Sequence, residues 1–277
     1  MLFFPPAKIN IGLRILRKRP DAYHDLELSF FAVPELCDVL EITPAAENVF
    51  LCEGLPVAGN PDDNLVLKAR NLIDRRLSSK LPPCRIHLLK KIPMGSGLGG
   101  GSSDATYTLI GLNKEFNLGF SQAELFEMAG SLGADCAFFT QRQACIGYGK
   151  GDDLHPLHTG HNLRYTLVVV VPDFGISTAQ AYKNSEPQEG RTPLAELLST
   201  DIGTWKGTIG NDFEKTLCPL YPQIDSIKEQ LYRKGALYAS LSGSGSAVFG
   251  IFELQRHPLV FDFPDSYFIH QSDIPIL

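Results

Sequence analysis

A glycine-rich segment in the first half of the chain limits what this protein can fold into and bind. Residues 93–104 read PMGSGLGGGSSD, with five glycines between positions 95 and 101. Glycine adopts positive φ angles and lets a ligand approach the main chain closely. An apolar stretch at 85–92 precedes the segment, and a helical pattern follows it from about 103 to 116. Because a helix N-terminus presents free N–H groups, this arrangement predicts a phosphate-binding loop.

Other interpretations of the loop are weaker. A turn without a ligand, capped by Ser102, Ser103 and Asp104, would not need so many glycines. Residues 95–100 match the dinucleotide pattern G-x-G-x-x-G, but that pattern alone is weak evidence. A dinucleotide site also needs a strand that ends in an acid about 20 residues further on. Here the helix leads through Gly119 to a second helix, and no Gly-Lys-Ser/Thr closes the loop as in a Walker A motif.

The composition is that of an ordinary globular protein, with 277 residues, 44% hydrophobic and 20% charged. No segment approaches the ~20 apolar residues that cross a bilayer. Pro5, Pro6 and Lys8 interrupt the apolar N-terminus, which is not typical of a signal peptide. We therefore expect a cytoplasmic protein without a membrane partner. A net charge of −6 argues against a nucleic-acid partner but allows a phosphate-bearing small substrate.

The remaining pattern alternates short strands and helices, which indicates an α+β fold. Ser121 and Glu124 form a capping box for one of the helices. Helices are expected at 63–77, 103–116, 121–133, 178–183 and 225–234, and strands in the first 60 residues and at 85–92, 136–139, 144–148, 164–171, 236–241 and 247–252. The polar segment 152–162 predicts a domain boundary. We expect an N-terminal domain at 1–152 and a C-terminal domain at 153–277, with the active site in the cleft between them.

Two charged residues lie among apolar neighbours. Lys8 stands between Ala7 and Ile9, an unusual place for a charge unless it is paired or points into a site. Asp135 follows a Gly-Ala pair before an apolar stretch, where a carboxylate can serve as a base. From residue type and position alone, a solvated lysine and an ordinary turn aspartate are the simpler explanations.

Six segments in order resemble the GHMP kinases. The glycine-rich loop resembles their central motif, and the remaining similar segments are Ala7–Asn10 (A-K-I-N), Arg19–Asp25 (R-P-D-G-Y-H-E), Pro61–Leu65 (P-x-D-N-L), Leu132–Phe139 (L-G-A-D-V-P-F-F) and Ser242–Ser246 (S-G-S-G-S). Within the family they are most similar to the branch that acts on a cytidine diphosphate derivative. The departures are Ala22 in place of Gly, Ser96 in place of Gly or Ala, and Cys136-Ala137 in place of Val-Pro.

The resemblance implies a two-domain GHMP kinase fold and ATP, with Mg²⁺, as the cofactor. The reaction would phosphorylate the 2-hydroxyl of a cytidine-diphosphate methylerythritol in the non-mevalonate isoprenoid route. Asp135 would act as the base, and Lys8 would contact both Asp135 and the acceptor hydroxyl. ATP would be held by Pro93, Met94, Gly95, Ser96, Gly97, Leu98, Gly99, Gly100, Gly101, Ser102 and Ser103, with Asn64, Leu65 and Lys90 around the adenine. Mg²⁺ would lie near Ser102 and Ser103.

The resemblance also implies a cytidine site. Tyr23 and Tyr182 would pack on the two faces of the cytosine, and His24 would hydrogen-bond its edge. Asn10, Gly243 and Ser244 would complete the substrate site, although 242–246 as a pattern alone predicts a hairpin turn. The protein would act as a monomer or homodimer.

Two alternatives remain at this point. One is another GHMP kinase, such as a homoserine kinase, against which the Tyr23-His24 pair and the A-K-I-N start argue. The other is a non-catalytic nucleotide-binding module, which would be expected to have lost Lys8 or Asp135, whereas the chain has both.

Overall fold

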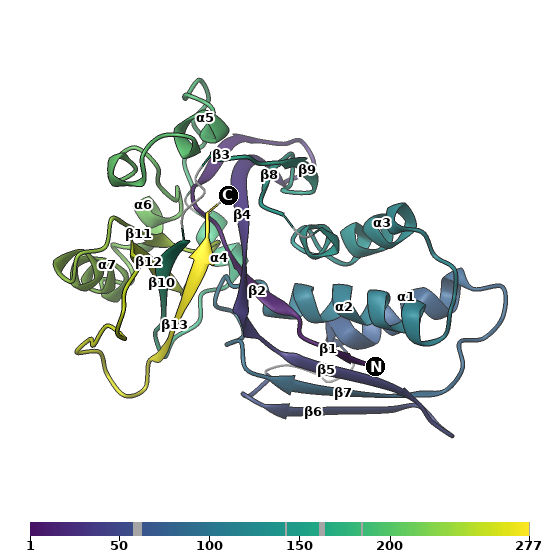
Figure 1. Ribbon diagram of the computed structural model, residues 1–277. Coiled ribbons are helices and arrows are strands. Elements are labelled where there is room, and N and C mark those ends of the chain that lie inside the picture. The colour runs from purple at the N-terminus through teal and green to yellow at the C-terminus, as the bar shows by residue number, and fades with distance from the viewer. Residues whose placement is uncertain (58–62, 142, 161–163, 184, 277) are drawn as a thin grey trace. The chain divides into compact units, whose positions relative to one another are not determined.

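The computed structural model describes residues 1–57, 63–141, 143–160, 164–183 and 185–276 (Figure 1). The chain divides into two compact units. Unit 1 comprises residues 1–7, 33–94 and 99–142, and unit 2 comprises residues 8–32, 95–98 and 143–277. The boundary expected near residue 152 stays a prediction. The units interleave along the chain, because 8–32 and 95–98 pack with the C-terminal half.

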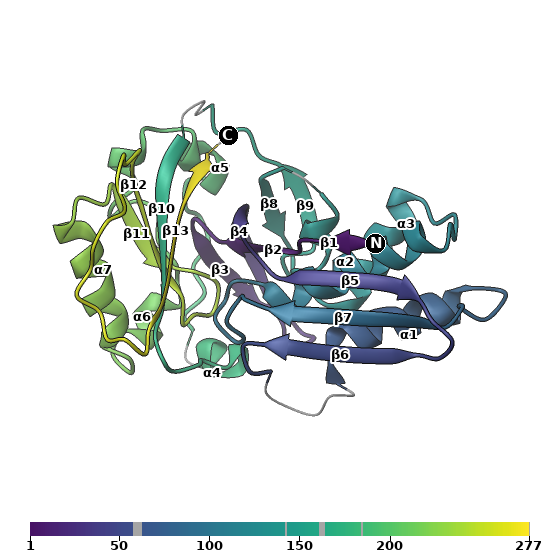
Figure 2. The ribbon, with the colours of Figure 1, turned by 60° about the horizontal axis from the view of Figure 1, so that its bottom comes forward.

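Unit 1 is a sheet with helices on one face. The strand order is β1 (Leu2–Phe3), β5 (Val39–Pro44), β7 (Cys84–Lys90) and β6 (Val49–Gly54), with β6 parallel to β7 and the other pairs antiparallel. Helices α1 (Leu65–Arg76), α2 (Gly100–Glu115) and α3 (Gln122–Leu132) belong to this unit. Figure 2 shows the sheet with α1 and α2 behind it. The core lies between these layers, where residues such as Leu40, Ile86 and Leu109 are almost fully buried.

Unit 2 contains an antiparallel sheet of four strands in the order β11 (Tyr238–Leu241), β12 (Val248–Glu253), β10 (Arg164–Val171) and β13 (Phe268–Pro275). A further sheet runs β2 (Pro6–Ile9), β4 (His24–Cys37), β8 (Cys145–Tyr148) and β9 (Asp153–Pro156), and β3 (Leu13–Lys18) also pairs with β4. Short helices α4 (Thr178–Tyr182), α5 (Leu194–Leu198) and α6 (Glu214–Leu217) and the longer α7 (Gln223–Arg233) complete it.

The α+β class is confirmed, and most expected elements lie within a few residues of their predicted bounds. The capping box is present, because Ser121 Oγ accepts from Glu124 N and the Glu124 carboxylate accepts from Ser121 N. Strands β9 and β13 were not predicted; β9 falls in the segment expected to link domains. Pro61 and Asp62 of one family-like segment lie outside the described residues. Among the described residues, no helix has the length and apolarity needed to cross a membrane.

Two local predictions were wrong. The helix after the loop begins at Gly100 rather than near Ser103, because Gly99 adopts φ 71° and turns the chain into the helix without a side-chain cap. Ser102, Ser103 and Asp104 therefore lie inside the helix. Residues 136–139 do not form a strand. Ala137–Thr140 is a 3₁₀ helix whose residues are all buried, and the short apolar run could not distinguish the two.

A buried ion-pair cluster connects the sheet of unit 1 to α2. Lys90 at the end of β7 pairs with Asp38 and with Asp104, the latter at 2.7 Å, and all three side chains are at most 3% exposed. Asp38 also accepts a hydrogen bond from Ile92 N at 2.9 Å. Two carboxylates share one ammonium group, so the ionised cluster has an excess negative charge. Burial, and to a smaller extent Asp38, raise the pKa of Asp104 to about 7, although Lys90 opposes the shift.

We expect the charge of Asp104 to make stability depend on pH. Its pKa is raised in the folded state, so its contribution is largest at low pH and is lost as the pH rises through about 7. Between pH 6 and pH 8 the unfolding free energy of the wild type should fall by about 1 kcal/mol relative to Asp104→Asn. Urea denaturation of both proteins at the two pH values measures this difference, and a difference of opposite sign would contradict the assignment.

Gly111 provides a test of the packing of α2 on the sheet. A Cβ there would lie 2.7 Å from Ile42 Cδ1 and 2.9 Å from Phe3 Cε2. We expect Gly111→Val to lower the unfolding free energy by about 1–3 kcal/mol, because the larger side chain overpacks this contact. Gly130 in α3 has no atom within 4 Å of its Cβ position. Gly130→Ala should therefore stabilise the protein by about 0.5–1 kcal/mol. An unchanged urea midpoint for Gly111→Val would show that this contact is loose.

Candidate functional site

The first half of the glycine-rich loop packs against the turn between β11 and β12. Ala247 N donates to Ser96 O at 2.9 Å, and Ser242 Oγ donates to Gly97 O at 3.1 Å. Gly97 adopts φ 77°, and a Cβ there would lie 2.1 Å from the Ser242 carbonyl oxygen. Only glycine permits this approach. Two turns that the sequence placed about 145 residues apart are therefore in direct contact.

Lys8 is held at this contact. Its main-chain N–H donates to Leu98 O at 2.9 Å, and its ammonium donates to Asn10 Oδ1 at 2.6 Å. Asn10 in turn donates from Nδ2 to Ser29 O at 2.8 Å, which orients the amide. Lys8 as a whole residue is only 2% exposed to solvent. A buried ammonium group held this way is a fixed positive charge in surroundings that strengthen its interaction with an anion.

Gly243 completes this group. A Cβ at Gly243 would lie 3.3 Å from both Lys8 Nζ and Asn10 Oδ1, and 3.2 Å from Gly97 O. The structure thus brings together Lys8, Asn10, Gly97 and Gly243, which the sequence predicted as site residues. Ser244, also predicted, lies 3.4 Å from Thr178 Oγ1 through its hydroxyl group.

Asn211 is a residue that the sequence analysis missed. Its Nδ2 donates to Gly243 O at 2.7 Å and to Leu241 O at 2.9 Å, so one side chain holds the whole turn. The residue is 3% exposed. Nothing in its local sequence indicates this role, because the partners lie about 30 residues away.

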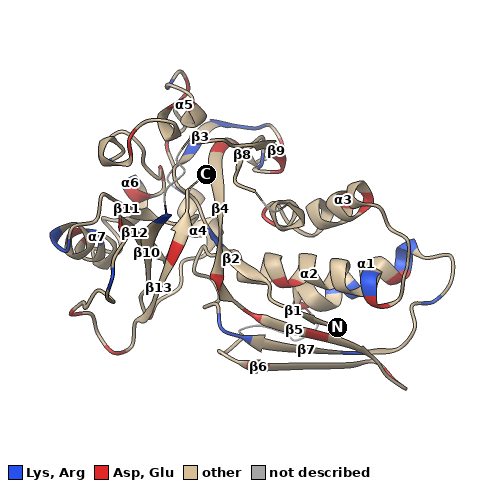
Figure 3. Ribbon diagram, in the orientation of Figure 1, with Lys and Arg blue, Asp and Glu red and all other residues tan. Residues whose placement is uncertain are grey.

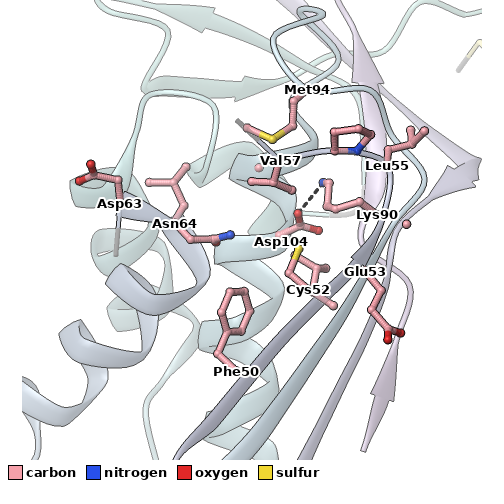
Figure 4. A pocket seen from close by; sticks show the side chains of 15 residues that line it. Phe50, Cys52, Glu53, Leu55, Val57, Asp63, Asn64, Lys90, Met94 and Asp104 are labelled. Atoms are coloured by element: carbon pink, nitrogen blue, oxygen red, sulfur yellow. Dashed lines mark hydrogen bonds and ion pairs between the residues drawn. The ribbon is translucent and has the colours of Figure 1, made fainter. Parts of the chain in front are cut away.

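Unit 1 contains a cavity of about 390 Å³ at the start of α2, shown in Figure 4. Five of the predicted nucleotide residues line it: Asn64, Leu65, Lys90, Met94 and Gly101. The sequence analysis missed other lining residues, among them Phe50, Cys52, Leu55, Val57 and Asp104. In Figure 4 Met94 and Val57 lie at one end of the cavity and Phe50 lies at the other. Its volume and its largely apolar walls with a few polar groups are typical of a small-molecule site.

Two of the polar groups that line this cavity already bond to other groups of the protein. Asn64 caps α1 through its Oδ1, which accepts from Val66 N at 2.9 Å. Lys90 is engaged by Asp38 and Asp104. Burial lowers the pKa of Lys90, but the two carboxylates outweigh it and raise the pKa overall, so the ammonium remains charged. Figure 4 shows Lys90 and Asp104 facing one another at the cavity.

Asp135 lies in unit 1, in the turn between α3 and the 3₁₀ helix, and is partly buried. The turn is tied to α2, because Thr106 Oγ1 donates to Cys136 O at 2.8 Å. Lys8 belongs to unit 2, so the pairing of Lys8 with Asp135 stays a prediction, as does an active site between the units.

The residues near the start of α2 fit a magnesium ion that arrives with a nucleotide. Ser103 Oγ is buried and has no hydrogen-bond partner within the described ranges. No group of three or more His, Cys, Asp or Glu that could hold a metal occurs in the part of the chain that the structure describes. Mg²⁺ that arrives with a nucleotide is commonly bound through one or two protein groups together with the substrate phosphates.

The predicted cytidine residues lie in unit 2. The rings of His24 and Tyr182 stack with centroids 4.8 Å apart at 15°, and Phe213 meets Tyr182 edge-on at 4.8 Å. Burial lowers the pKa of His24, and the charge of Lys18 lowers it further, so the ring is neutral at pH 7. A neutral imidazole has one donor and one acceptor nitrogen. Tyr23 is 59% exposed.

Ala22 precedes Tyr23 and His24 in a left-handed conformation, with φ 66°. The similar segment of the family has glycine at this position. The left-handed conformation explains the preference for glycine, because glycine adopts a positive φ without steric cost. The ring of Tyr23 faces Lys150, whose Nζ lies 3.9 Å from the ring centroid. Lys150 is another residue that the sequence did not single out.

Models of known families match both halves of the chain. The family described as "GHMP kinases N terminal domain" matches residues 64–143, and "GHMP kinases C terminal" matches residues 194–263. A 4-diphosphocytidyl-2-C-methyl-D-erythritol kinase of Bacteroides fragilis (strain YCH46) is 43% identical over 278 residues, which cover 99% of this chain and 100% of that protein. The enzyme of the same name from Bacteroides thetaiotaomicron is 44% identical, with 91% of this chain and 92% of that protein covered.

Solved structures agree with this likeness. A crystal structure of 4-(cytidine 5'-diphospho)-2C-methyl-D-erythritol kinase has a TM-score of 0.76 and 29% identity, and covers 91% of this chain and 90% of that one. A homoserine kinase from Cytophaga hutchinsonii has a TM-score of 0.65 at 19% identity over 92% of this chain and 85% of that one, which shows the shared fold alone. The chain therefore belongs to the GHMP kinases, a class of small-molecule kinases, and within them to the family of the 4-diphosphocytidyl-2-C-methyl-D-erythritol kinases.

Proposed function

We propose that this protein transfers the γ-phosphoryl group of ATP to the 2-hydroxyl of 4-diphosphocytidyl-2-C-methyl-D-erythritol, in the non-mevalonate isoprenoid pathway. The names and near-complete coverage of the relatives support this acceptor. The protein would work in the cytoplasm with small molecules only, as a monomer or homodimer. A homoserine kinase activity has no specific observation in its favour, since that likeness is limited to the fold.

The buried Lys8 carries the proposal. Its ammonium donates to Asn10 Oδ1, and the main chain at Gly243 approaches both groups so closely that a Cβ there would lie 3.3 Å from each. Phosphoryl transfer needs little covalent chemistry from the protein, which has to align the reactants and stabilise the charge that develops. A preorganised ammonium group at this position would do so without rearranging during the reaction.

The remaining roles divide between the two units. The apolar cavity next to Asn64, Leu65 and Met94 would hold the adenosine end of ATP, and the loop amides at the start of α2 would bind its phosphates. Asp135 would accept the proton of the attacking hydroxyl. A Mg²⁺ bound with ATP near Ser103 would neutralise phosphate charge.

The acceptor's base would be recognised by His24 and Tyr182. Their rings lie too close together for a base to enter between them. Cytosine would therefore stack on Tyr182 after His24 swings from the ring face to the edge of the base. There a neutral imidazole can donate to and accept from the polar groups of cytosine. Tyr23, exposed near this point in the sequence, would cover the opposite face of the base.

We expect Asp135→Asn to reduce kcat to below about a tenth of the wild-type value, while nucleotide affinity stays within a few-fold. The amide keeps the shape of the carboxylate but cannot accept the proton. Lys8→Met should also lower kcat strongly, with a smaller effect on the KM for ATP. Steady-state kinetics and ADP titrations measure these quantities.

The matched control is Asp153→Asn, which changes an aspartate whose side chain is 68% exposed and should leave kcat unaltered. If Asp135→Asn keeps a larger kcat, Asp135 is not the base. If Lys8→Met instead weakens ATP binding as much as it lowers kcat, Lys8 acts on the nucleotide.

The acceptor assignment predicts discrimination between bases. Replacing cytidine with uridine in the acceptor should lower kcat/KM by roughly 10²-fold or more, because the exocyclic amine and ring N3 exchange donor and acceptor roles. Homoserine, mevalonate and galactose should not be phosphorylated. His24→Ala should reduce the discrimination and leave the KM for ATP nearly unchanged.

His155→Ala changes a histidine with a 58% exposed side chain and should retain the full preference for cytidine. Equal use of the uridine acceptor by the wild type would remove the cytidine site while leaving the kinase assignment in place. A His24→Ala variant that mainly weakens ATP binding would place His24 elsewhere in the mechanism.

A further inference from the structure

Unit 2 contains a second cavity, of about 470 Å³, that has no role in the reaction described above. It lies among β3, the segment at 206–214, α7 and β11. Five basic side chains line it, together with only two acidic ones: Arg14, Arg191, Lys206, Lys215 and Lys228, with Asp212 and Glu214. The excess is three positive charges in a chain whose net charge is −6. Figure 3 shows basic and acidic positions next to each other around α6 and α7.

Both acidic side chains already bond to other groups of the protein. Asp212 binds Arg191 through both carboxylate oxygens at 2.8 Å, and one of these also accepts from Ile15 N at 2.8 Å. Glu214 accepts from Leu241 N at 2.7 Å and pairs with Lys228. These bonds hold Arg191 and Lys228 in place at the wall of the cavity.

Arg191 keeps unused hydrogen-bond donors after these pairings. A guanidinium group has five N–H donors, of which Asp212 uses two on Arg191. Arg191 Nε is buried and has no hydrogen-bond partner within the described residues. A buried donor without a partner is costly, and an anion can supply the missing acceptor.

Two exposed lysines add charge at the rim. Lys206 lies with its Nζ 4.1 Å from the centroid of the Tyr232 ring, which holds the ammonium over the cavity wall. Lys215 follows Glu214 on α6 and also lines the cavity. Arg14 contributes from the opposite element, β3, where its pair with Glu27 is 2.9 Å long and almost fully buried. Cations therefore face the cavity from several elements.

We propose that this cavity binds a small anion that carries a phosphate or diphosphate group. Arginine and lysine groups converging from separate elements match the several oxygens of a phosphoryl group better than the two oxygens of a carboxylate. The volume is sufficient for a ligand larger than a single phosphate.

The cavity also adjoins the segment that holds the turn at 242–246. Gly210 and Asp212 line the cavity and flank Asn211, the residue that holds the turn at 243 by a 2.7 Å hydrogen bond. An occupant would therefore contact the segment that positions Asn211, which provides a physical route from this cavity to the turn.

The test is a calorimetric titration of the full chain saturated with ADP, so that the nucleotide site is filled, with inorganic pyrophosphate and separately with inorganic phosphate. We expect one ion to bind per chain in at least one of the two titrations. The Lys206→Gln/Lys215→Gln double variant should bind that ion at least about tenfold more weakly, because two charge-assisted interactions are lost. Both lysines are exposed, so the variant should keep the wild-type melting temperature and KM for ATP.

Lys234→Gln is the matched control, since Lys234 is an exposed lysine just after α7 that does not line the cavity. It should bind as the wild type does. Stronger binding of pyrophosphate than of phosphate would assign the site to diphosphates, and the reverse order to single phosphates. Absence of binding for both ions, or equal binding by the wild type and the double variant, would overturn the proposal.

Discussion

The contact between the glycine-rich loop and the turn at 242–246 is the constraint on which the arrangement of Lys8 depends. The main chain at Gly97 approaches the Ser242 carbonyl so closely that a Cβ would lie 2.1 Å from it. The same loop receives a main-chain hydrogen bond from Lys8 through Leu98 O. A side chain at Gly97 would force these segments apart. The glycine at position 97 is therefore required for packing between protein segments.

The protein buries two lysines in different ways. Lys90 has two carboxylate partners, and the resulting cluster connects β7 with α2. Lys8 donates to Asn10 Oδ1 at 2.6 Å, beside the turn that contains Gly243. A buried charge is tolerated only when other groups or a ligand stabilise it. Lys90 therefore links two elements of unit 1, whereas Lys8 lies beside the turn at 242–246 in unit 2.

Arg191 and Asn211 show how the turn at 242–246 is supported by neighbouring residues. Asp212 binds Arg191 and the main chain of β3, and the neighbouring Asn211 binds the main chain of the turn. Consecutive residues thus join a charged cavity and a glycine-rich turn. A rigid support of this kind keeps the flexible glycines of the turn in one conformation.

The sequence by itself determined the α+β class, the capping box at Ser121 and the family, and it predicted a phosphate-binding loop. These features depend on local patterns or on short motifs in a set order. It could not distinguish a 3₁₀ helix from a strand at 136–139, because four buried apolar residues satisfy both. It also placed the start of α2 too late, because Gly99 caps the helix with its backbone conformation rather than with a side chain.

Only the tertiary structure decided which residues meet. The cluster of Lys8, Asn10, Gly97 and Gly243, the clamp by Asn211 and the cavity lined by Arg14 and Lys228 all join residues far apart in the chain. Such contacts follow from the packing of whole elements, which leaves no trace in the local pattern of any one of them.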